Sequence, residues 1–195
     1  RGPTKRELDA VMPDRPVLVF HISGHTCYAN SKALERIGVN PDAPFDDVNV
    51  FLGKDGLVLA DLPEGARIGT SSLRRAAQVY RVRPDVECVS IRGNLATRWR
   101  KLQEDEGMAG IILAVAGVER LGWSDRITEY LAPDVVMPAA GQGIIAVEVA
   151  AGRDDAAALV RAVNHAESER AARAERSFLA ALEGGCQTPI GALAA

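Results

Sequence analysis

The sequence predicts an α/β fold in which a mixed, twisted sheet is flanked by helices over about residues 48–149. Apolar runs here alternate with glycine-marked turns and helical patterns, most clearly at residues 67–80. Residues 110–115 carry no polar side chain, which is typical of a central strand buried on both faces. With 195 residues, 47% of them hydrophobic, the chain can bury the core of one or two domains.

Residues 1–47 differ in sequence pattern from the rest of the chain. They predict a helix over residues 4–11, a strand over 17–20 and a helix over 30–37, followed by a proline-containing joint at 42–47. Parts of residues 8–34 resemble a segment of metal-dependent amidohydrolases, where His21 and His25 would be the metal-binding candidates. Two histidines without further ligands close no site, and His165 lies far away, so the interpretation without metal is favoured.

The chain is organised around residues 67–75, RIGTSSLRR, which predict a strand, a tight turn and a helix capped by Ser71 or Ser72. The unpaired amides and the dipole of a helix start attract anions, and Arg74 and Arg75 follow at once. The alternative is an ordinary capped helix with two solvated arginines. From these nine residues alone the two interpretations have equal weight.

Positive charge is concentrated around this motif. Residues 67–101 hold nine basic side chains and two acidic ones, in a chain whose net charge is -3. This contrast indicates an anionic ligand. A small polyanion is favoured over nucleic acid, because only Tyr80 and Trp99 offer stacking surfaces in this stretch.

A second strand-turn-helix segment repeats the pattern of residues 67–75. Residues 86–91 predict a strand, and Asn94 would cap a helix over residues 95–104. Arg98 lies one turn beyond Asn94 on the same helix face, so Arg92 and Arg98 could converge on the same ligand as Arg74 and Arg75. The alternative is a pair of surface arginines on an amphipathic helix.

Further elements follow these two strand-turn-helix segments. Residues 116–117 are expected to turn into a short helix that holds Arg120, and residues 144–149 to form a strand. Before that strand, Gln142 lies between two glycines, where it could approach a ligand or only make a bend.

Helices are expected over residues 154–163 and 169–182, with a core-facing side on the second (Ala172, Phe178, Leu179 and Leu182). Glycines 184 and 185 stop the second helix, which places Cys186 in a loop. The three cysteines are odd in number and widely spaced, as expected for free thiols in the cytoplasm. Cys88 is expected to be buried and inert. The sequence holds neither an apolar run long enough to span a membrane nor a signal-like leader.

Six motifs, in this order, resemble the hydroxymethylbilane synthase (porphobilinogen deaminase) family. They are GTSSLRR at 69–75, IRGN with TR at 91–98, ILAVAG with RLG at 112–122, PAAGQG at 138–143, AER at 174–176 and LEGGCQTPIG at 182–191. The resemblance covers about residues 48–195. It implies a periplasmic-binding-protein-like middle domain at 48–150, and at 151–195 return helices with a cofactor loop and the start of a C-terminal domain.

The resemblance also implies a function. The family condenses four porphobilinogens with release of ammonia, in tetrapyrrole (heme) biosynthesis, and is usually monomeric. Its dipyrromethane cofactor is bound through a thioether to the cysteine that matches Cys186. By the same match the cofactor-binding residues are Thr70, Ser71, Ser72, Arg74, Arg75, Arg92 and Gly93, and the substrate-binding residues are Arg98, Arg120 and Gln142. Arginine forks suit the acetate and propionate arms of each pyrrole.

The sequence also departs from the family pattern. The His-Ser-x-Lys-Asp motif, which carries the family's catalytic aspartate, does not occur, so none of the catalytic residues is present. We therefore expect a foreign-looking segment at 1–47 and little or no turnover by this polypeptide. The alternatives are a non-catalytic carboxylate-binding domain and an amidohydrolase fusion. We also expect exposed apolar surface on the helices after residue 154.

Overall fold

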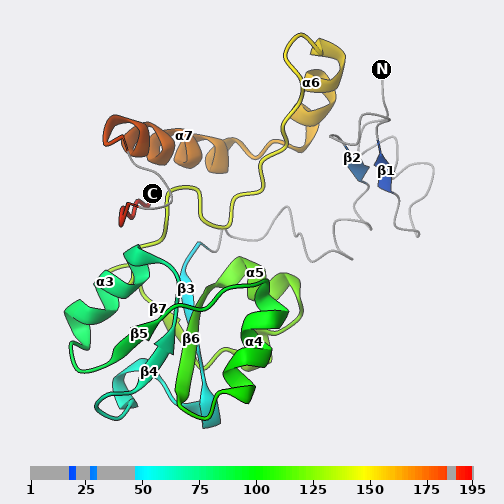
Figure 1. Ribbon diagram of the computed structural model, residues 1–195. Coiled ribbons are helices and arrows are strands. Elements are labelled where there is room, and N and C mark those ends of the chain that lie inside the picture. The colour runs from blue at the N-terminus through cyan, green and yellow to red at the C-terminus, as the bar shows by residue number, and fades with distance from the viewer. Residues whose placement is uncertain (1–17, 21–26, 30–46, 184–187, 195) are drawn as a thin grey trace. The chain divides into compact units, whose positions relative to one another are not determined.

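The computed structural model describes residues 18–20, 27–29, 47–183 and 188–194 (Figure 1). The chain divides into two compact units, Arg1–Pro44 with Ile145–Glu169, and Phe45–Ile144 with Arg170–Ala195. The helices predicted at 4–11 and 30–37 lie outside the described residues, as do His21, His25 and Cys186.

The first unit contains an antiparallel pair of strands, β1 (Leu18–Phe20) and β2 (Cys27–Ala29). The strand predicted at 17–20 is thereby confirmed. The unit also contains α6 (Asp154–Val160), which continues as the 3₁₀ turn η4 (Arg161–Val163). Two aspartates occupy the first turn of α6, where negative charge complements the helix dipole.

The second unit is built on a five-stranded mixed sheet in the order β5-β4-β6-β3-β7 (Figure 1). Two of its pairings are parallel, β4 with β5 and β4 with β6, and β3 runs antiparallel to both β6 and β7. The predicted mixed sheet is therefore confirmed. Its strands are β3 (Asn49–Gly53), β4 (Arg67–Gly69), β5 (Glu87–Val89), β6 (Met108–Ala114) and β7 (Glu129–Leu131).

Helices follow the parallel strands. They are α3 (Leu73–Val82) after β4, α4 (Leu95–Glu104) after β5 and α5 (Val115–Arg120) after β6. Short 3₁₀ turns complete the connections, η1 (Lys54–Gly56), η2 (Leu59–Asp61) and η3 (Ser124–Arg126). The turn predicted at residues 116–117 is wrong, because β6 ends at Ala114 and the chain enters α5 directly at Val115.

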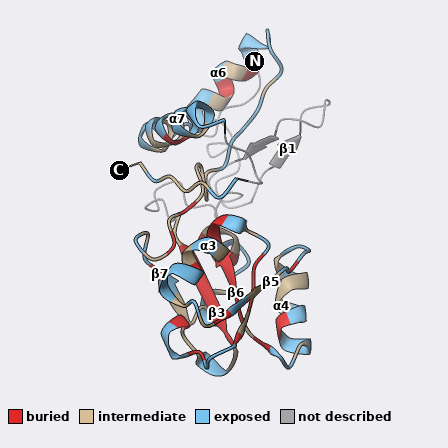
Figure 2. Cartoon of the chain, turned by 60° about the vertical axis from the view of Figure 1, so that its left-hand side comes forward, coloured by how far each residue is buried: buried red, intermediate tan, exposed pale blue. Residues whose placement is uncertain are grey.

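Two apolar clusters form the core of this unit. Side chains alternate along β6, so that Ile112 belongs to one cluster while Ile111 and Leu113 belong to the other. On β3, Phe51 and Val50 divide in the same way. Figure 2 shows that β3 and β6 are buried at the centre of this unit. The uninterrupted apolar run at residues 110–115 predicted this burial for β6, so the prediction is confirmed.

Two predictions after the sheet are wrong. Residues 144–149 form no strand, since no described strand pairs with them, and Ile145 and Val147 are 53% and 46% exposed. The helix α7 (Ala166–Ala181) does form, but Phe178 and Leu182 are 49% and 52% exposed instead of facing a core. The buried position on this helix is the polar residue Glu175. The exposed apolar side chains agree with the expectation of open apolar surface here.

Candidate anion-binding site

The polar motifs meet at one edge of the sheet. Because β4 and β5 are parallel, their carboxyl ends lie side by side, and α3 and α4 begin just beyond them. The antiparallel strand β3 starts at the same edge, where Asn49 pairs with Ala114 and with Leu131. The turns before α3 and α4 therefore lie beside the start of β3.

The hydroxyl side chains shape the first turn. Ser72 is the N-cap of α3, and its Oγ accepts a hydrogen bond from the amide of Arg75 at 3.4 Å. Thr70 Oγ1 accepts from the amide of Ser72 at 3.2 Å. Ser71 Oγ donates to the carbonyl of Ile91 at 2.5 Å, which ties the first turn to the second. Of the two caps expected from sequence, Ser72 is the one observed.

Arg74 and Arg75 are buried, with 6% and 9% of their surfaces exposed. Arg75 donates from Nε to Asn49 Oδ1 at 2.8 Å and from Nη1 to the carbonyl of Ile112 at 3.1 Å. Arg74 donates to the carbonyl of Met137 and, from Nη2, to Gln142 Oε1 at 3.1 Å. The alternative of two solvated arginines is wrong.

Burial of these charges is costly without an anion. Desolvation, together with the positive charges of Arg74 and Arg98, lowers the pKa of Arg75 to about 9. Burial also lowers the pKa of Arg74 to about 10. The hydrogen bonds described for both guanidinium groups go to neutral oxygens. An anionic ligand would offset this concentration of charge, so the residues present fit a group that carries carboxylates.

The second turn adds Arg92, Gly93 and Arg98. Arg98 donates from Nε to the carbonyl of Gly93 at 2.8 Å, and its charge acts on Arg75. The backbone of Gly93 has a φ of 121°, a region that favours glycine, and a Cβ there would lie 2.6 Å from Thr97 Cγ2. Arg92 is exposed. Arg98, Arg74 and Arg75 therefore lie near one another, and Arg92 begins the adjoining turn.

Gln142 lies in the loop after β7, and Arg120 binds this loop. Gln142 Oε1 accepts from Arg74, while its Nε2 donates to the carbonyls of Asp47 and, at 3.2 Å, Val48. Arg120 donates from Nη2 to the carbonyl of Gly143 at 2.8 Å. Gln142 thus contacts one of the candidate anion-binding arginines and also joins two segments of backbone.

Sequence reasoning missed Asn49. Its side chain has no exposed surface, accepts from Arg75, and donates from Nδ2 to the carbonyl of Val136 at 2.9 Å. The available signal was an amide at the start of an otherwise apolar strand, 49–53.

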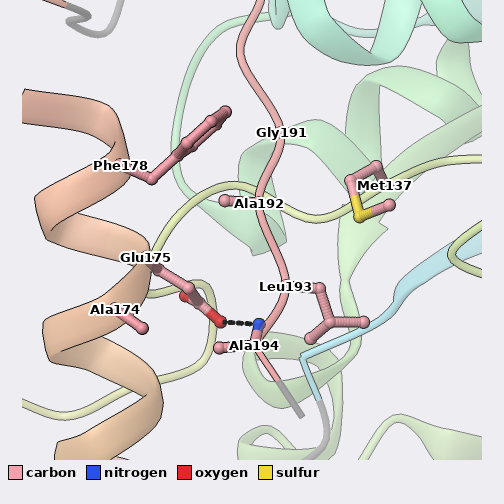
Figure 3. A pocket seen from close by; sticks show the side chains of 8 residues that line it. All are labelled: Met137, Ala174, Glu175, Phe178, Gly191, Ala192, Leu193 and Ala194. Carbon is pink, nitrogen blue, oxygen red and sulfur yellow. Dashed lines mark hydrogen bonds between the residues drawn. The ribbon is translucent and has the colours of Figure 1, made fainter. Parts of the chain in front are cut away.

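Glu175 belongs to the AER motif at 174–176, and the sequence alone predicts no role for it. It is 5% exposed, and its carboxylate accepts from the amide of Gly141 at 2.6 Å and from that of Ala194 at 2.9 Å. Beside it lies a cavity of about 310 Å³ between α7, Met137 and residues 191–194 (Figure 3). Phe178 and Leu193 contribute apolar walls.

The structure also bears on the predictions for Cys88, for metal binding and for membrane-spanning segments. Cys88, which was expected to be buried, is only half-buried, and burial raises the pKa of its thiol, as is typical of an unreactive cysteine. Within the described ranges no three metal-binding side chains gather, and no helix there is long and apolar enough to cross a bilayer.

Fold and site together define an α/β domain with a mixed sheet and a cluster of buried arginines at the edge where its helices begin. A family model described as "Porphobilinogen deaminase, dipyromethane cofactor binding domain" matches residues 29–158. A second, described as "Porphobilinogen deaminase, C-terminal domain", matches residues 170–195. The chain belongs to the porphobilinogen deaminase family.

Curated relatives agree with this assignment. Porphobilinogen deaminase of Desulfitobacterium hafniense is 58% identical over 146 residues, which cover 75% of this chain and 47% of the relative. That of Carboxydothermus hydrogenoformans is 54% identical over 144 residues, covering 74% and 46%. That of Roseiflexus castenholzii is 50% identical over 149 residues, covering 76% and 49%. The chain therefore spans about half the length of these relatives.

The resemblance inferred from the six motifs is thus confirmed, and the matching domain is one that binds a dipyrromethane cofactor. The first match begins at residue 29, inside the segment that the sequence sets apart as foreign-looking. The boundary near residue 47 therefore stays a prediction.

Proposed function

We propose that the second unit binds the carboxylates of a dipyrromethane cofactor and of a pyrrole chain that grows from porphobilinogen. The burial of Arg74 and Arg75 beside Arg98, with neutral hydrogen-bond partners, is the observation that carries this proposal. Each added pyrrole brings acetate and propionate groups. A ligand that gains charge in this way needs several cationic side chains.

The residue roles follow the matched motifs. In this proposal Thr70, Ser71 and Ser72 provide hydroxyl and helix-start donors, while Arg74, Arg75, Arg92 and Gly93 form the remaining cofactor-binding positions. Arg98, Arg120 and Gln142 are the substrate-binding positions, and Gln142 acts on the substrate through Arg74, to which its side chain is hydrogen-bonded. Cys186 provides the sulfur of a thioether to the cofactor, whose two pyrrole rings add carboxylates of the same kind as those of the substrate. Each arginine orients a carboxylate and remains protonated while doing so.

The whole protein, in this proposal, is a cytoplasmic transferase of heme biosynthesis that joins four porphobilinogens and releases ammonia. It acts as a monomer. The 195 residues contain no His-Ser-x-Lys-Asp motif and so no candidate for the general acid. This polypeptide alone is therefore expected to give no steady consumption of porphobilinogen.

The intact mass of denatured protein tests the cofactor directly. The chain is expressed in a host that produces porphobilinogen, and peptides are mapped across Cys186 and Cys88. We expect a dipyrromethane adduct on Cys186 and an unmodified Cys88, which serves as the internal control. Unmodified Cys186 in soluble, folded protein would instead favour a non-catalytic carboxylate-binding domain, because the buried arginines alone suit any polycarboxylate.

A further inference from the structure

Two amide side chains hold the two buried arginines. Asn49 Oδ1 accepts from Arg75 Nε at 2.8 Å, and Gln142 Oε1 accepts from Arg74 Nη2 at 3.1 Å. A guanidinium group has only donors, so each amide must turn its oxygen toward the arginine. The NH₂ group of each amide is therefore directed to another acceptor.

The two NH₂ groups donate to backbone carbonyls in two segments, and each segment supplies the donor for the other. We call residues 47–49 the entry segment and residues 136–143 the exit segment of the sheet. Asn49, in the entry segment, donates to the carbonyl of Val136 in the exit segment at 2.9 Å. Gln142, in the exit segment, donates to the carbonyls of Asp47 and Val48 in the entry segment. Each segment thus supplies one amide side chain that binds the backbone of the other.

We propose that Asn49 and Gln142 are positioning residues that form one reciprocal clasp. The clasp fixes the guanidinium groups of Arg75 and Arg74 for an anionic ligand and couples ligand binding to the packing of the entry segment against the exit segment. Only the identity of the ligand rests on the proposed function.

The coupling has a physical basis. The guanidinium groups available to a ligand are the same groups that orient the two amides, so a ligand that holds the arginines also holds the clasp. A ligand that binds the closed clasp more tightly than an open one must shift the population toward the closed form. Ligand bound near Arg74 would then slow the opening of both segments.

The first test needs no ligand. Hydrogen exchange is measured on the full chain for Asn49→Ala and Gln142→Ala. Each substitution is expected to speed exchange about tenfold in both segments, as for the loss of one hydrogen bond to a charged group. The matched control is Gln78→Ala, because Gln78 accepts from the amide of Met137 at 2.8 Å but binds neither the entry segment nor an arginine side chain. It should affect the exit segment alone.

The second test measures porphobilinogen affinity by calorimetry in a Cys186→Ser background, which prevents covalent attachment. Each single alanine substitution is expected to weaken binding about tenfold, and the double variant by less than the product of the two. Gln78→Ala leaves both amide contacts to the arginine side chains in place, so it should change the affinity less than either clasp variant. Should Asn49→Ala not fold, Asn49→Asp retains an oxygen for Arg75 and loses the donor to Val136, so exchange should still rise in both segments. Its carboxylate would pair with Arg75 in place of an anionic ligand, so this variant serves the exchange test only.

The outcomes separate the two proposals. Exchange changes confined to the substituted segment, or a double variant equal to the product of the singles, would overturn the clasp. If both segments respond but wild-type protein does not bind porphobilinogen, the proposed function fails and the clasp stands. Binding by wild-type protein together with unchanged affinity in both single variants would refute the positioning role.

Discussion

The carboxylate of Glu175 on α7 accepts a hydrogen bond from the backbone amide of Gly141 at 2.6 Å, next to the residue that contacts Arg74. Its other oxygen accepts from the amide of Ala194 at 2.9 Å. One buried side chain thus joins α7 to the exit segment and to residues 188–194, and Figure 3 shows its contact with Ala194.

Replacing Glu175 by glutamine should therefore destabilise this junction. The shape is retained, but an NH₂ group then faces a backbone N–H, which leaves a buried donor unsatisfied. We expect a loss of about 1–3 kcal/mol in the free energy of unfolding, measured by chemical denaturation. Glu167→Gln on the exposed part of the same helix is the matched control and should cost less, about 0.3–1 kcal/mol, from the lost interaction of a first-turn carboxylate with the helix dipole. Equal losses in the two variants would contradict the role of the junction.

Anion affinity should fall at alkaline pH because of Arg75. Its pKa is lowered to about 9 in the folded protein, below its unfolded value, so the buried charge opposes folding at neutral pH and this cost is relieved as the pH rises above about 9. A bound carboxylate requires the protonated guanidinium. Affinity should thus be constant near neutral pH and decline as the pH passes through about 9.

Calorimetry with porphobilinogen at fixed ionic strength measures this decline. The amine of the ligand also titrates, so wild type is compared with Arg75→Gln and Arg92→Gln, which share the ligand's own pH dependence. The decline near pH 9 should persist in Arg92→Gln, since Arg92 is exposed, and vanish in Arg75→Gln, which keeps only the later decline from Arg74, whose pKa is about 10. Identical pH profiles for all three proteins would show that Arg75 does not titrate with ligand binding.

Local signals in the sequence predicted most of the sheet domain. The helix at residues 95–104 was expected with the bounds that α4 has, and Asn94 caps it through an acceptor placed 2.8 Å from the amide of Thr97. Such features depend on a few neighbouring residues.

The burial of the arginines could not be predicted in this way. Their partners lie far along the chain, Asn49 and Ile112 for Arg75, and Met137 and Gln142 for Arg74. An alternation of apolar and basic residues would ordinarily turn the apolar side chains inward, yet Leu73 and Tyr80 are 53% and 41% exposed. Tertiary hydrogen bonds, rather than the helical pattern, decide which face of α3 is buried.

Gly93→Ala should disturb the second turn. A Cβ at this positive φ would lie 2.6 Å from Thr97 Cγ2, so we expect a loss of about 2–4 kcal/mol from strain and overlap together. Gly122→Ala is the control for strain alone, because Gly122 also has a positive φ but no neighbouring atom within 4 Å of its added Cβ. The melting temperature measured by thermal unfolding should be lower for Gly93→Ala than for Gly122→Ala. Adding Thr97→Ser, which removes Cγ2, should recover part of the difference, and no recovery would argue against the overlap.

Arg83 should stabilise the end of α3 at neutral pH and less so in acid. Its guanidinium donates to the carbonyls of Leu59 and Leu62 at 2.7 and 2.6 Å and pairs with Asp85 at 2.6 Å. Arg83→Lys cannot make the forked contacts, so we expect a loss of about 1 kcal/mol at neutral pH by chemical denaturation.

The hydrogen bond from Arg83 lowers the pKa of Asp85 below its ordinary value of 3.8. A lowered carboxyl pKa contributes stability above the unfolded pKa, and this contribution is lost as the pH falls below about 3.8 toward the folded value. Wild type and Asp85→Asn should therefore differ in the free energy of unfolding at neutral pH and converge in acid. Arg153 and Asp155 form a similar pair near the start of α6, so Asp155→Asn serves as the matched comparison for a pair in the first unit. A gap between wild type and Asp85→Asn that stays constant into acid would show that the pair with Arg83 does not lower the pKa of this carboxyl.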